Sequence, residues 1–270
     1  MSGFSSHWLA LREPLDLAAR SKSVEDQFLK LLPAENIRIL DLASGAGSTV
    51  SALARRFKTP VEWHLTDYDR DLLKVAVARR YGTGNFTLSI QQVDLAADLE
   101  TLNFQDVSAV TTSAFLDLVS ESFLQRLVKK VVQSGKPFLG ALSYDGRAEF
   151  EPSHMLDTEL RNGLNRHQKT DKGFGLSLGP DAAQRAIELF AQAGYQVLSD
   201  TSDWEIDAGK RDFLIEFLGG WQRVGKELGL EMSKLEDWWQ DRSSLISHGS
   251  LRMKVGHIDF VAFPPQSSAD

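Results

Sequence analysis

A short apolar run followed by a glycine turn, within residues 37–57 (IRILDLASGAGSTVSALARRF), constrains the fold of this chain more than any other segment. Residues 37–40 are apolar apart from one arginine and have polar neighbours, which is the pattern of a buried parallel strand. Gly45 and Gly47 follow in a turn where the backbone can approach a ligand closely, because glycine has no side chain. Apolar residues then recur at helical spacing, so the positive end of a helix would face that ligand. Strand, turn and helix together predict a nucleotide-type site.

The spacing of the glycines indicates which nucleotide binds. A dinucleotide fingerprint requires G-x-G-x-x-G, but Val50 stands where the third glycine should be. The run D-L-A-x-G-x-G instead resembles the first motif of class I S-adenosylmethionine-dependent methyltransferases, an acidic residue followed by G-x-G-x-G. Asp41, Gly45 and Gly47 match that motif, and Ala43 stands at its first glycine. A plain strand-to-helix connection without a ligand remains the alternative.

Asp67 is the next residue that the resemblance assigns to the cofactor. It ends the predicted strand 61–67, and ligands of open α/β sheets bind at the carboxyl ends of strands. A carboxylate there can accept hydrogen bonds from both ribose hydroxyls. The resemblance implies this role for Asp67, and the adjacent Tyr68 would pack on the adenine. A solvated aspartate in a turn is the alternative.

Two further segments complete the implied cofactor site. Asp94 and Leu95 follow the third predicted strand, at 85–90, and match positions that bind the adenine amino group and ring in the resembled class. An aspartate that caps a turn would look the same in sequence. The fourth predicted strand, 107–115, ends beside the transferring methyl group in that class, and Ser113 within it is assigned to the cofactor site.

Candidate groups for the chemistry follow the fourth and fifth predicted strands. Asp117 could orient a substrate or take its proton, although a polar residue at a helix start would look alike. Tyr144, near the end of the predicted strand 137–145, is a second candidate base. The chain has no D/N-P-P-Y/F/W run after the fourth strand, which counts against a nucleic-acid base as the substrate.

Residues 161–179 (RNGLNRHQKTDKGFGLSLG) are basic and rich in glycine, although the chain as a whole is acidic. Without a clear apolar period, this segment is predicted to be a loop or lid. Arg166 and Lys172 would hold a carboxylate or phosphate of an anionic substrate. His167 is the leading general-base candidate, because its ordinary pKa lies near neutrality. A solvated surface loop is the alternative.

Composition excludes several other classes of function. The 270-residue chain contains no cysteine, which removes disulfides, thiolate nucleophiles and cysteine-type zinc sites, and no metal site is predicted. A net charge of −7 disfavours a nucleic-acid partner. No apolar run approaches the roughly 20 residues that span a bilayer, and no signal pattern begins the chain, so we expect a cytoplasmic protein without a membrane partner.

These patterns predict one doubly wound α/β domain with a seven-stranded sheet, mostly parallel with an antiparallel last strand. Helices would cover both faces. The predicted divisions are an N-terminal helical cap (1–34), a cofactor-binding core (35–200), a helical insertion (205–250), the last strand (251–265) and a disordered tail (266–270). Tryptophans at helical spacing in the insertion are treated first as core.

The function that the resemblance implies is methyl transfer from S-adenosylmethionine to a small anionic molecule, with S-adenosylhomocysteine as the product. The protein would align the acceptor, methyl and sulfur in line and exclude water. An NAD(P)-dependent oxidoreductase is the first alternative, weakened by the missing third glycine and the lack of a Tyr-x-x-x-Lys pair. A non-catalytic cofactor-binding protein that acts through a partner is the second. Whether the chain forms a homodimer is left open.

Overall fold

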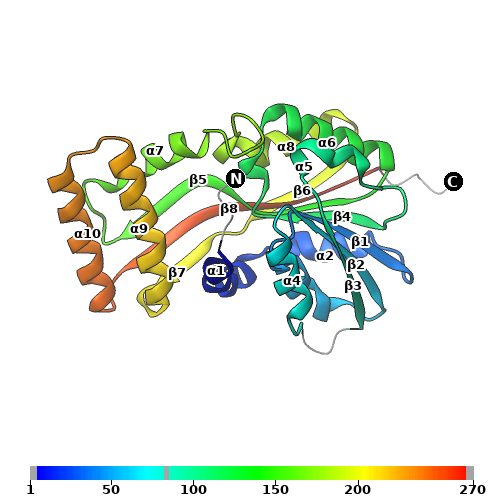
Figure 1. The fold of residues 1–270 in the computed structure, drawn as a ribbon, viewed down its shortest axis with the longest axis horizontal. Helices are drawn as coiled ribbons and strands as arrows, with labels where there is room; N and C mark the ends of the chain where they lie inside the picture. Colours follow the sequence, from blue (N-terminus) through cyan, green and yellow to red (C-terminus); the bar gives the residue numbers. More distant parts are fainter. Residues whose placement is uncertain (1–4, 82–84, 266–270) are drawn as a thin grey trace.

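A sheet covered by helices forms the body of the protein in the computed structural model, which describes residues 5–81 and 85–265 (Figure 1). The strand order is β3-β2-β1-β4-β5-β8-β6, and β7 pairs with β8. Strands β1 to β5 pair in parallel, whereas β8 runs antiparallel to β5, β6 and β7. The tail predicted for 266–270 lies outside the described residues. The strands are β1 (Ile37–Leu42), β2 (Val61–Asp67), β3 (Phe86–Gln92), β4 (Ala109–Ser113), β5 (Phe138–Glu151), β6 (Gln196–Thr201), β7 (Trp204–Asp207) and β8 (Arg252–Phe263).

Helices precede the sheet, connect its strands and form one end of the molecule. The α-helices are α1 (Ser6–Ala19), α2 (Lys22–Lys30), α3 (Ser48–Leu53), α4 (Arg70–Ala78), α5 (Leu95–Asp98), α6 (Glu121–Ser134), α7 (Asp157–Gln168), α8 (Ala182–Gln192), α9 (Arg211–Glu227) and α10 (Met232–Ser247). Short 3-10 turns are η1 (Ala54–Arg56), η2 (Leu99–Thr101), η3 (Leu116–Leu118), η4 (Gly179–Asp181) and η5 (Ala208–Lys210).

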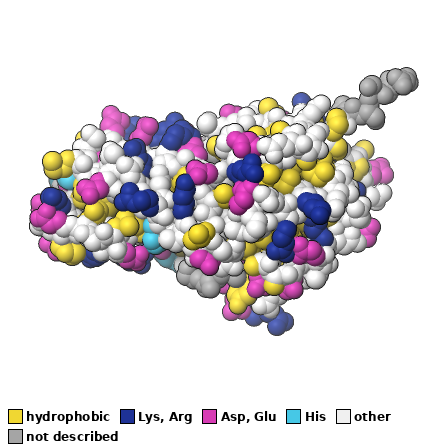
Figure 2. Space-filling model, turned by 90° about the horizontal axis from the view of Figure 1, so that it is seen from above, with side chains coloured by type: hydrophobic (Ala, Val, Ile, Leu, Met, Phe, Trp, Pro, Cys, Tyr) yellow, Lys and Arg dark blue, Asp and Glu magenta, His cyan; other side chains and the backbone are white. Residues whose placement is uncertain are grey.

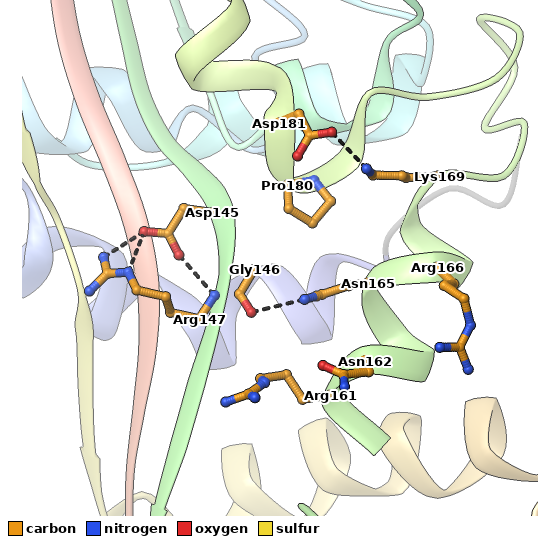
Figure 3. Close-up of a pocket in the computed structure, with 10 residues that line it drawn as sticks. All are labelled: Asp145, Gly146, Arg147, Arg161, Asn162, Asn165, Arg166, Lys169, Pro180 and Asp181. Atoms are coloured by element: carbon orange, nitrogen blue, oxygen red, sulfur yellow. Dashed lines mark hydrogen bonds and ion pairs between the residues drawn. The ribbon is translucent and has the colours of Figure 1, made fainter. Parts of the chain in front are cut away.

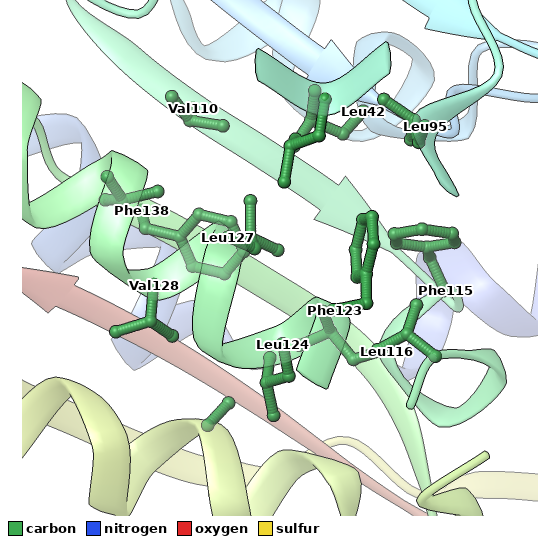
Figure 4. Close-up of a cluster of buried hydrophobic side chains, with 14 of the residues drawn as sticks. Leu42, Leu95, Val110, Phe115, Leu116, Phe123, Leu124, Leu127, Val128 and Phe138 are labelled. Carbon is green, nitrogen blue, oxygen red and sulfur yellow. The ribbon is translucent and has the colours of Figure 1, made fainter. Parts of the chain in front are cut away.

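Side chains of β1 alternate between two buried faces, as a strand inside a doubly wound sheet requires. Leu40 and Leu42 join the cluster under α5, α6 and α8. Ile37 and Ile39 join the cluster under α2, α3 and α4. Figure 4 shows part of the first cluster, in which side chains of α6 pack against β4 and β5. The predicted doubly wound α/β class with helices on both faces is therefore confirmed.

The predicted number of strands is wrong by one, because the sheet has eight strands and seven were expected. The additional strand is β7, which pairs with the first half of β8. It alternates as a strand with one buried face does, since Trp204 and Ile206 are buried while Glu205 and Asp207 are exposed. Four residues are too short for that alternation to be distinguished from a loop in the sequence.

Strands β5 and β8 continue past the carboxyl end of β4 and carry a second hydrophobic core. Ser113, the last residue of β4, pairs with Ala141, but β5 continues to Glu151. Helices α7, α9 and α10 pack on this extension and form the lobe to the left of α1 in Figure 1. Trp221 and Trp238 are 2% and 0% exposed there, so the tryptophans of the predicted insertion do belong to a core.

The prediction of a loop over residues 161–179 is wrong for its first half, because 161–168 belong to helix α7. The helix shows little apolar periodicity, since only Leu160 and Gly163 are buried in it. A side chain at Gly163 would lie 2.3 Å from Leu228, which follows α9. The glycine therefore permits close helix packing and does not mark a loop, and Arg166 and His167 lie on a helix.

Over residues 5–81 and 85–265, none of the helices combines the length and the apolar character that a membrane-crossing segment needs.

Candidate functional site

The turn between β1 and α3 has an unusual backbone that explains its small residues. Ala43, Gly45 and Gly47 have positive φ angles of 51°, 51° and 84°. This left-handed conformation costs an L-residue about 1–2 kcal/mol, which is why glycine is usual at the position of Ala43. At Gly47 a Cβ atom would lie 2.1 Å from the hydroxyl of Tyr81, so no side chain fits there. Gly47 therefore allows the turn to pack closely against Tyr81 and α4.

Asp67 holds this turn in place from the end of β2. Its carboxylate accepts the backbone N–H of Gly45 at 2.8 Å and that of Asp69 at 2.8 Å. Burial raises the pKa of Asp67, and the two backbone donors oppose the rise. Each carboxylate oxygen carries further lone pairs, so the group can accept a ligand hydroxyl while it holds the turn. Asp67 and the glycine turn therefore form one unit at the carboxyl edge of the sheet.

Asp41 is a buried carboxylate beneath the same turn. It is 1% exposed, and its Oδ1 accepts the hydroxyl of Thr111 at 2.6 Å. Its Oδ2 is buried without a hydrogen-bond partner among the described residues. Burial raises the pKa of Asp41 to about 6, and the bond from Thr111 opposes that rise. An unpartnered buried carboxylate oxygen is costly unless a ligand satisfies it.

The pKa of Asp41 predicts how this residue affects stability. Because the pKa is raised from 3.8 to about 6 in the folded chain, the stability it contributes is present at low pH and is lost as the pH rises through about 6. Asparagine does not titrate. We expect the unfolding free energy of Asp41→Asn, relative to the natural chain, to increase by about 2 kcal/mol from pH 4 to pH 8. Urea unfolding at both pH values measures this change; an unchanged difference would contradict the assignment.

Helix α1 covers the glycine turn. Leu9 of α1 lies 3.5 Å from the position that a Cβ atom would take at Gly45. Arg79, just after α4, donates to the carbonyl of Ala46 at 2.8 Å and pairs with Glu13 of α1. The turn is therefore held between the sheet and α1. This arrangement is consistent with the predicted N-terminal cap.

The other residues predicted to bind the cofactor lie at the ends of β2, β3 and β4. Asp94 caps α5, and its Oδ1 accepts the backbone N–H of Ala96 at 3.0 Å. Leu95 is buried, whereas Tyr68 is 54% exposed. Ser113 is half-buried at the last position of β4. Asp94 thus performs the capping role that was its alternative interpretation, and its adenine contact stays a prediction.

Asp117, the first of the predicted reactive groups, follows the end of β4 by four residues. It lies in η3, and its Oδ1 is buried without a hydrogen-bond partner among the described residues. Burial raises the pKa of Asp117 to about 6, while its own backbone N–H and the charges of Arg12 and Lys172 oppose the rise. A carboxylate with this pKa is ionised at neutral pH and remains a stronger base than an exposed one.

The other two candidate bases have different surroundings. The hydroxyl of Tyr144 donates to Oδ1 of Asn165 at 2.8 Å, and burial raises the pKa of Tyr144 far above its ordinary value. His167 on α7 lies 3.2 Å from a carboxylate oxygen of Glu227 at the end of α9. Tyr144 is therefore poorly suited to accept a proton, and His167 faces α9. Their catalytic roles stay predictions.

Residues 169–178, between α7 and η4, form a loop, as predicted for this part of the segment. Phe174 packs between Phe115 and Phe123, with ring centroids 5.4 and 4.8 Å away. Leu178 donates its backbone N–H to the carbonyl of Val119 at 2.8 Å. These contacts hold the loop over η3, where the charge of Lys172 acts on Asp117. Arg166, by contrast, lines a separate pocket beside α7.

Sequence reasoning missed the arginines at the junction between the lobes. Arg12 of α1 pairs with Asp16 at 2.9 Å and lies over the ring of Trp204. Arg20 is 6% exposed, and its guanidinium nitrogens have no hydrogen-bond partner among the described residues, although Glu25 lies 3.8 Å away. Nothing in the sequence of the helical segment before the first strand predicted that these arginine side chains would be buried.

The strand order and the antiparallel β8 between β5 and β6 define the fold of class I methyltransferases, as the resemblance implied. A solved structure bears this out. The cyclopropane-fatty-acyl-phospholipid synthase-like protein from Lactobacillus casei is 14% identical, with a TM-score of 0.52 over 97% of this chain and 95% of that one. At this identity the likeness establishes the fold alone.

Two other solved structures are similar but less well superimposed. The YcgJ protein from Bacillus subtilis is 16% identical, with a TM-score of 0.49 over 91% of this chain and 99% of that one. Phosphoethanolamine N-methyltransferase 2 from Haemonchus contortus, solved with S-adenosylmethionine, is 14% identical, with a TM-score of 0.45. The match covers 90% of this chain and 52% of that one. No protein-family model matches the sequence, and no curated protein matches it in a sequence comparison.

Proposed function

We propose that this chain transfers a methyl group from S-adenosylmethionine to a small anionic molecule and releases S-adenosylhomocysteine. The observation that carries the proposal is the unit formed by the glycine turn and Asp67, whose carboxylate accepts the N–H of Gly45 at 2.8 Å. The residues fit the cofactor in two further respects. Gly45 and Gly47 have the left-handed backbone of a tight turn at the carboxyl edge of the sheet, and Oδ2 of Asp41 beneath it lacks a partner among the described residues.

In this proposal the cofactor supplies a sulfonium, which activates the methyl group for displacement. The residues of the chain bind the cofactor and orient it. Asp67 would accept the ribose hydroxyls, and Asp94 and Leu95 would contact the adenine. Leu9 and the Glu13–Arg79 pair keep α1 over the turn, which helps to exclude water. The antiparallel β8 and the buried Val50 at the third glycine position make this assignment better supported than a dinucleotide.

Asp117 is the residue that we assign to proton removal. A hydroxyl or carbon acceptor must lose a proton as the new bond to the methyl group forms, and a carboxylate with a pKa of about 6 can take it at neutral pH. An amine acceptor would only need to arrive neutral. The charge of Lys172 that acts on Asp117, and Arg166 on α7, support an anionic acceptor. The cytoplasmic location and the lack of nucleic-acid or membrane partners stay predictions from the sequence.

The test of this proposal is the change of Asp67 to alanine. The variant loses the ribose acceptor and leaves the N–H groups of Gly45 and Asp69 without their partner. We expect its affinity for S-adenosylhomocysteine to fall at least about a hundredfold, which corresponds to two or more charge-assisted hydrogen bonds. Titration calorimetry measures this affinity directly.

Asp207→Ala is the matched control for this change. Asp207 also accepts a backbone N–H two residues on, from Gly209 at 2.9 Å, but it is the last residue of β7 and does not bond to the glycine turn. This variant should bind as the natural chain does. Equal affinity in the Asp67 variant and the natural chain would show that the cofactor does not sit at this turn.

A further inference from the structure

A pocket of about 560 Å³ lies between helix α7 and the middle of β5, beyond the carboxyl end of β4 (Figure 3). One face of α7 forms its outer wall, where Asn162, Asn165, Arg166 and Lys169 follow each other at helical spacing. The opposite wall comes from β5 and η4. The remaining lining residues are Asp145, Gly146, Arg147, Arg161, Pro180 and Asp181.

The pocket has a positive charge that its own ion pairs do not neutralise. Arg147 pairs with Asp145 and Asp203, and Lys254 also pairs with Asp203, so these two cations and two carboxylates balance. Lys169 pairs with Asp181 at 2.6 Å. Over residues 5–81 and 85–265, Arg161 and Arg166 make no ion pair. Figure 2 shows several Lys and Arg side chains on this face, over the region of α7, with Asp and Glu side chains among them.

Arg161 and the two asparagines supply hydrogen-bond donors inside the pocket. Arg161 is half-buried, and its one hydrogen bond is a long one of 3.4 Å to the carbonyl of Ala148. In Figure 3 its guanidinium points toward β5, while Arg166 lies at the outer edge of α7. Asn165 is fixed between the carbonyl of Gly146 and the hydroxyl of Tyr144. Arg161 is therefore the principal free cation that faces the interior.

We propose that this pocket binds the phosphate group of a phosphomonoester, with Arg161 as the main ligand and Arg166 at the rim. Two unpaired arginines carry a charge of +2, which matches a phosphomonoester of about −1.5 to −2 at neutral pH. The planar guanidinium can also donate two parallel hydrogen bonds to phosphate oxygens. Arg166 was predicted to bind an anion. Arg161 was not, and Lys172 does not line this pocket.

The pocket's position relates it to the proposed methyl transfer, on which this part of the inference rests. Tyr144 of β5 donates its hydroxyl to Asn165 in the wall of the pocket, and β5 also contacts η3, which carries Asp117. A molecule whose phosphate is held by Arg161 could therefore extend past Tyr144 toward Asp117. The inference assigns the substrate class as a phosphomonoester, with its acceptor atom on the far side from the phosphate.

The test is calorimetric titration of inorganic phosphate into the full chain saturated with S-adenosylhomocysteine, which keeps phosphate away from the glycine turn. We expect saturable binding that weakens with added salt. Arg161→Gln should lower the affinity at least about tenfold, as the loss of one charge-assisted hydrogen-bonding group does. Arg166→Gln should lower it less. Arg223→Gln removes an exposed charge from α9, outside the pocket, and should leave binding unchanged.

Three results would overturn the proposal. These are no saturable phosphate binding by the natural chain, equal affinity in Arg161→Gln, and acetate binding as tightly as phosphate. Thermal unfolding of each variant confirms that it is folded. The first step of the titration separates this inference from the proposed function: if S-adenosylhomocysteine does not bind but phosphate binding still depends on Arg161, the anion pocket stands and its link to methyl transfer is wrong.

Discussion

Replacing Gly47 with alanine is expected to lower the affinity for S-adenosylhomocysteine by roughly a hundredfold or more, equivalent to about 3 kcal/mol. The new Cβ atom would lie 2.1 Å from the hydroxyl of Tyr81 and 3.3 Å from Cβ of Ala76, and the φ angle of 84° is strained for alanine. Either the turn or Tyr81 must move. Because Gly47 is also the N-cap of α3, a shift there displaces the backbone that faces the cofactor.

Gly135→Ala is the control that has the backbone strain of a positive φ angle without the steric clash of Gly47→Ala. Gly135 has a φ angle of 68° after α6, but a Cβ atom there would meet nothing within 4 Å. This variant should lose about 1 kcal/mol of stability and bind normally. Adding Tyr81→Phe to Gly47→Ala removes the closest clashing atom and should recover part of the affinity. Normal binding by Gly47→Ala in calorimetry would show that this turn does not contact the cofactor.

Replacing Arg242 with methionine is expected to cost about 3–5 kcal/mol of unfolding free energy, the largest stability effect we predict. The side chain of Arg242 is 0% exposed and forms bonds of 2.9 and 2.7 Å to the two carboxylate oxygens of Asp157. It also donates to the carbonyl of Pro152 at 2.7 Å. The change leaves the carboxylate of Asp157 with Trp238 as its one remaining side-chain donor among the described residues.

Arg126→Met is the control, because Arg126 makes a similar two-bond pair with Glu100 on the surface. There the side chains are 41% and 60% exposed, so the expected loss is under about 1 kcal/mol. Urea unfolding measures both variants. A loss of similar size in the two would mean that the pair between α10 and α7 does not stabilise the second lobe. Binding of S-adenosylhomocysteine should be unaffected in either variant.

The strand, glycine turn and helix at residues 37–53 could be predicted from the sequence because their signals are local. The strand, glycine turn and helix occupy consecutive residues, and Asp67 ends a strand whose length the alternation defines. The positive φ of Ala43 could not be seen in the sequence, although the motif aligned this residue with a glycine. Doubly wound topology then followed from the repeated order of strands and helices.

The second lobe was less predictable because its determinants are contacts between distant segments. Gly163 in α7 appears as a helix breaker until Leu228 is seen against it. Arg242 is an ordinary polar residue in sequence, yet it is wholly buried by pairing with Asp157. The position of Arg161 in a pocket was equally hard to predict, because β5 and η4 form the opposite wall of that pocket. The spacing of apolar residues in the sequence does not predict such contacts between distant segments.

The central claim is that the glycine turn and Asp67 bind the S-adenosyl group, and titration of the natural chain tests it most directly. S-adenosylhomocysteine and NADH are each titrated into the purified protein by calorimetry. We predict binding of the first at one site per chain, with a Kd in the micromolar range, and no heat from the second. Binding of NADH without binding of S-adenosylhomocysteine would contradict the claim and make this turn an irregular dinucleotide site.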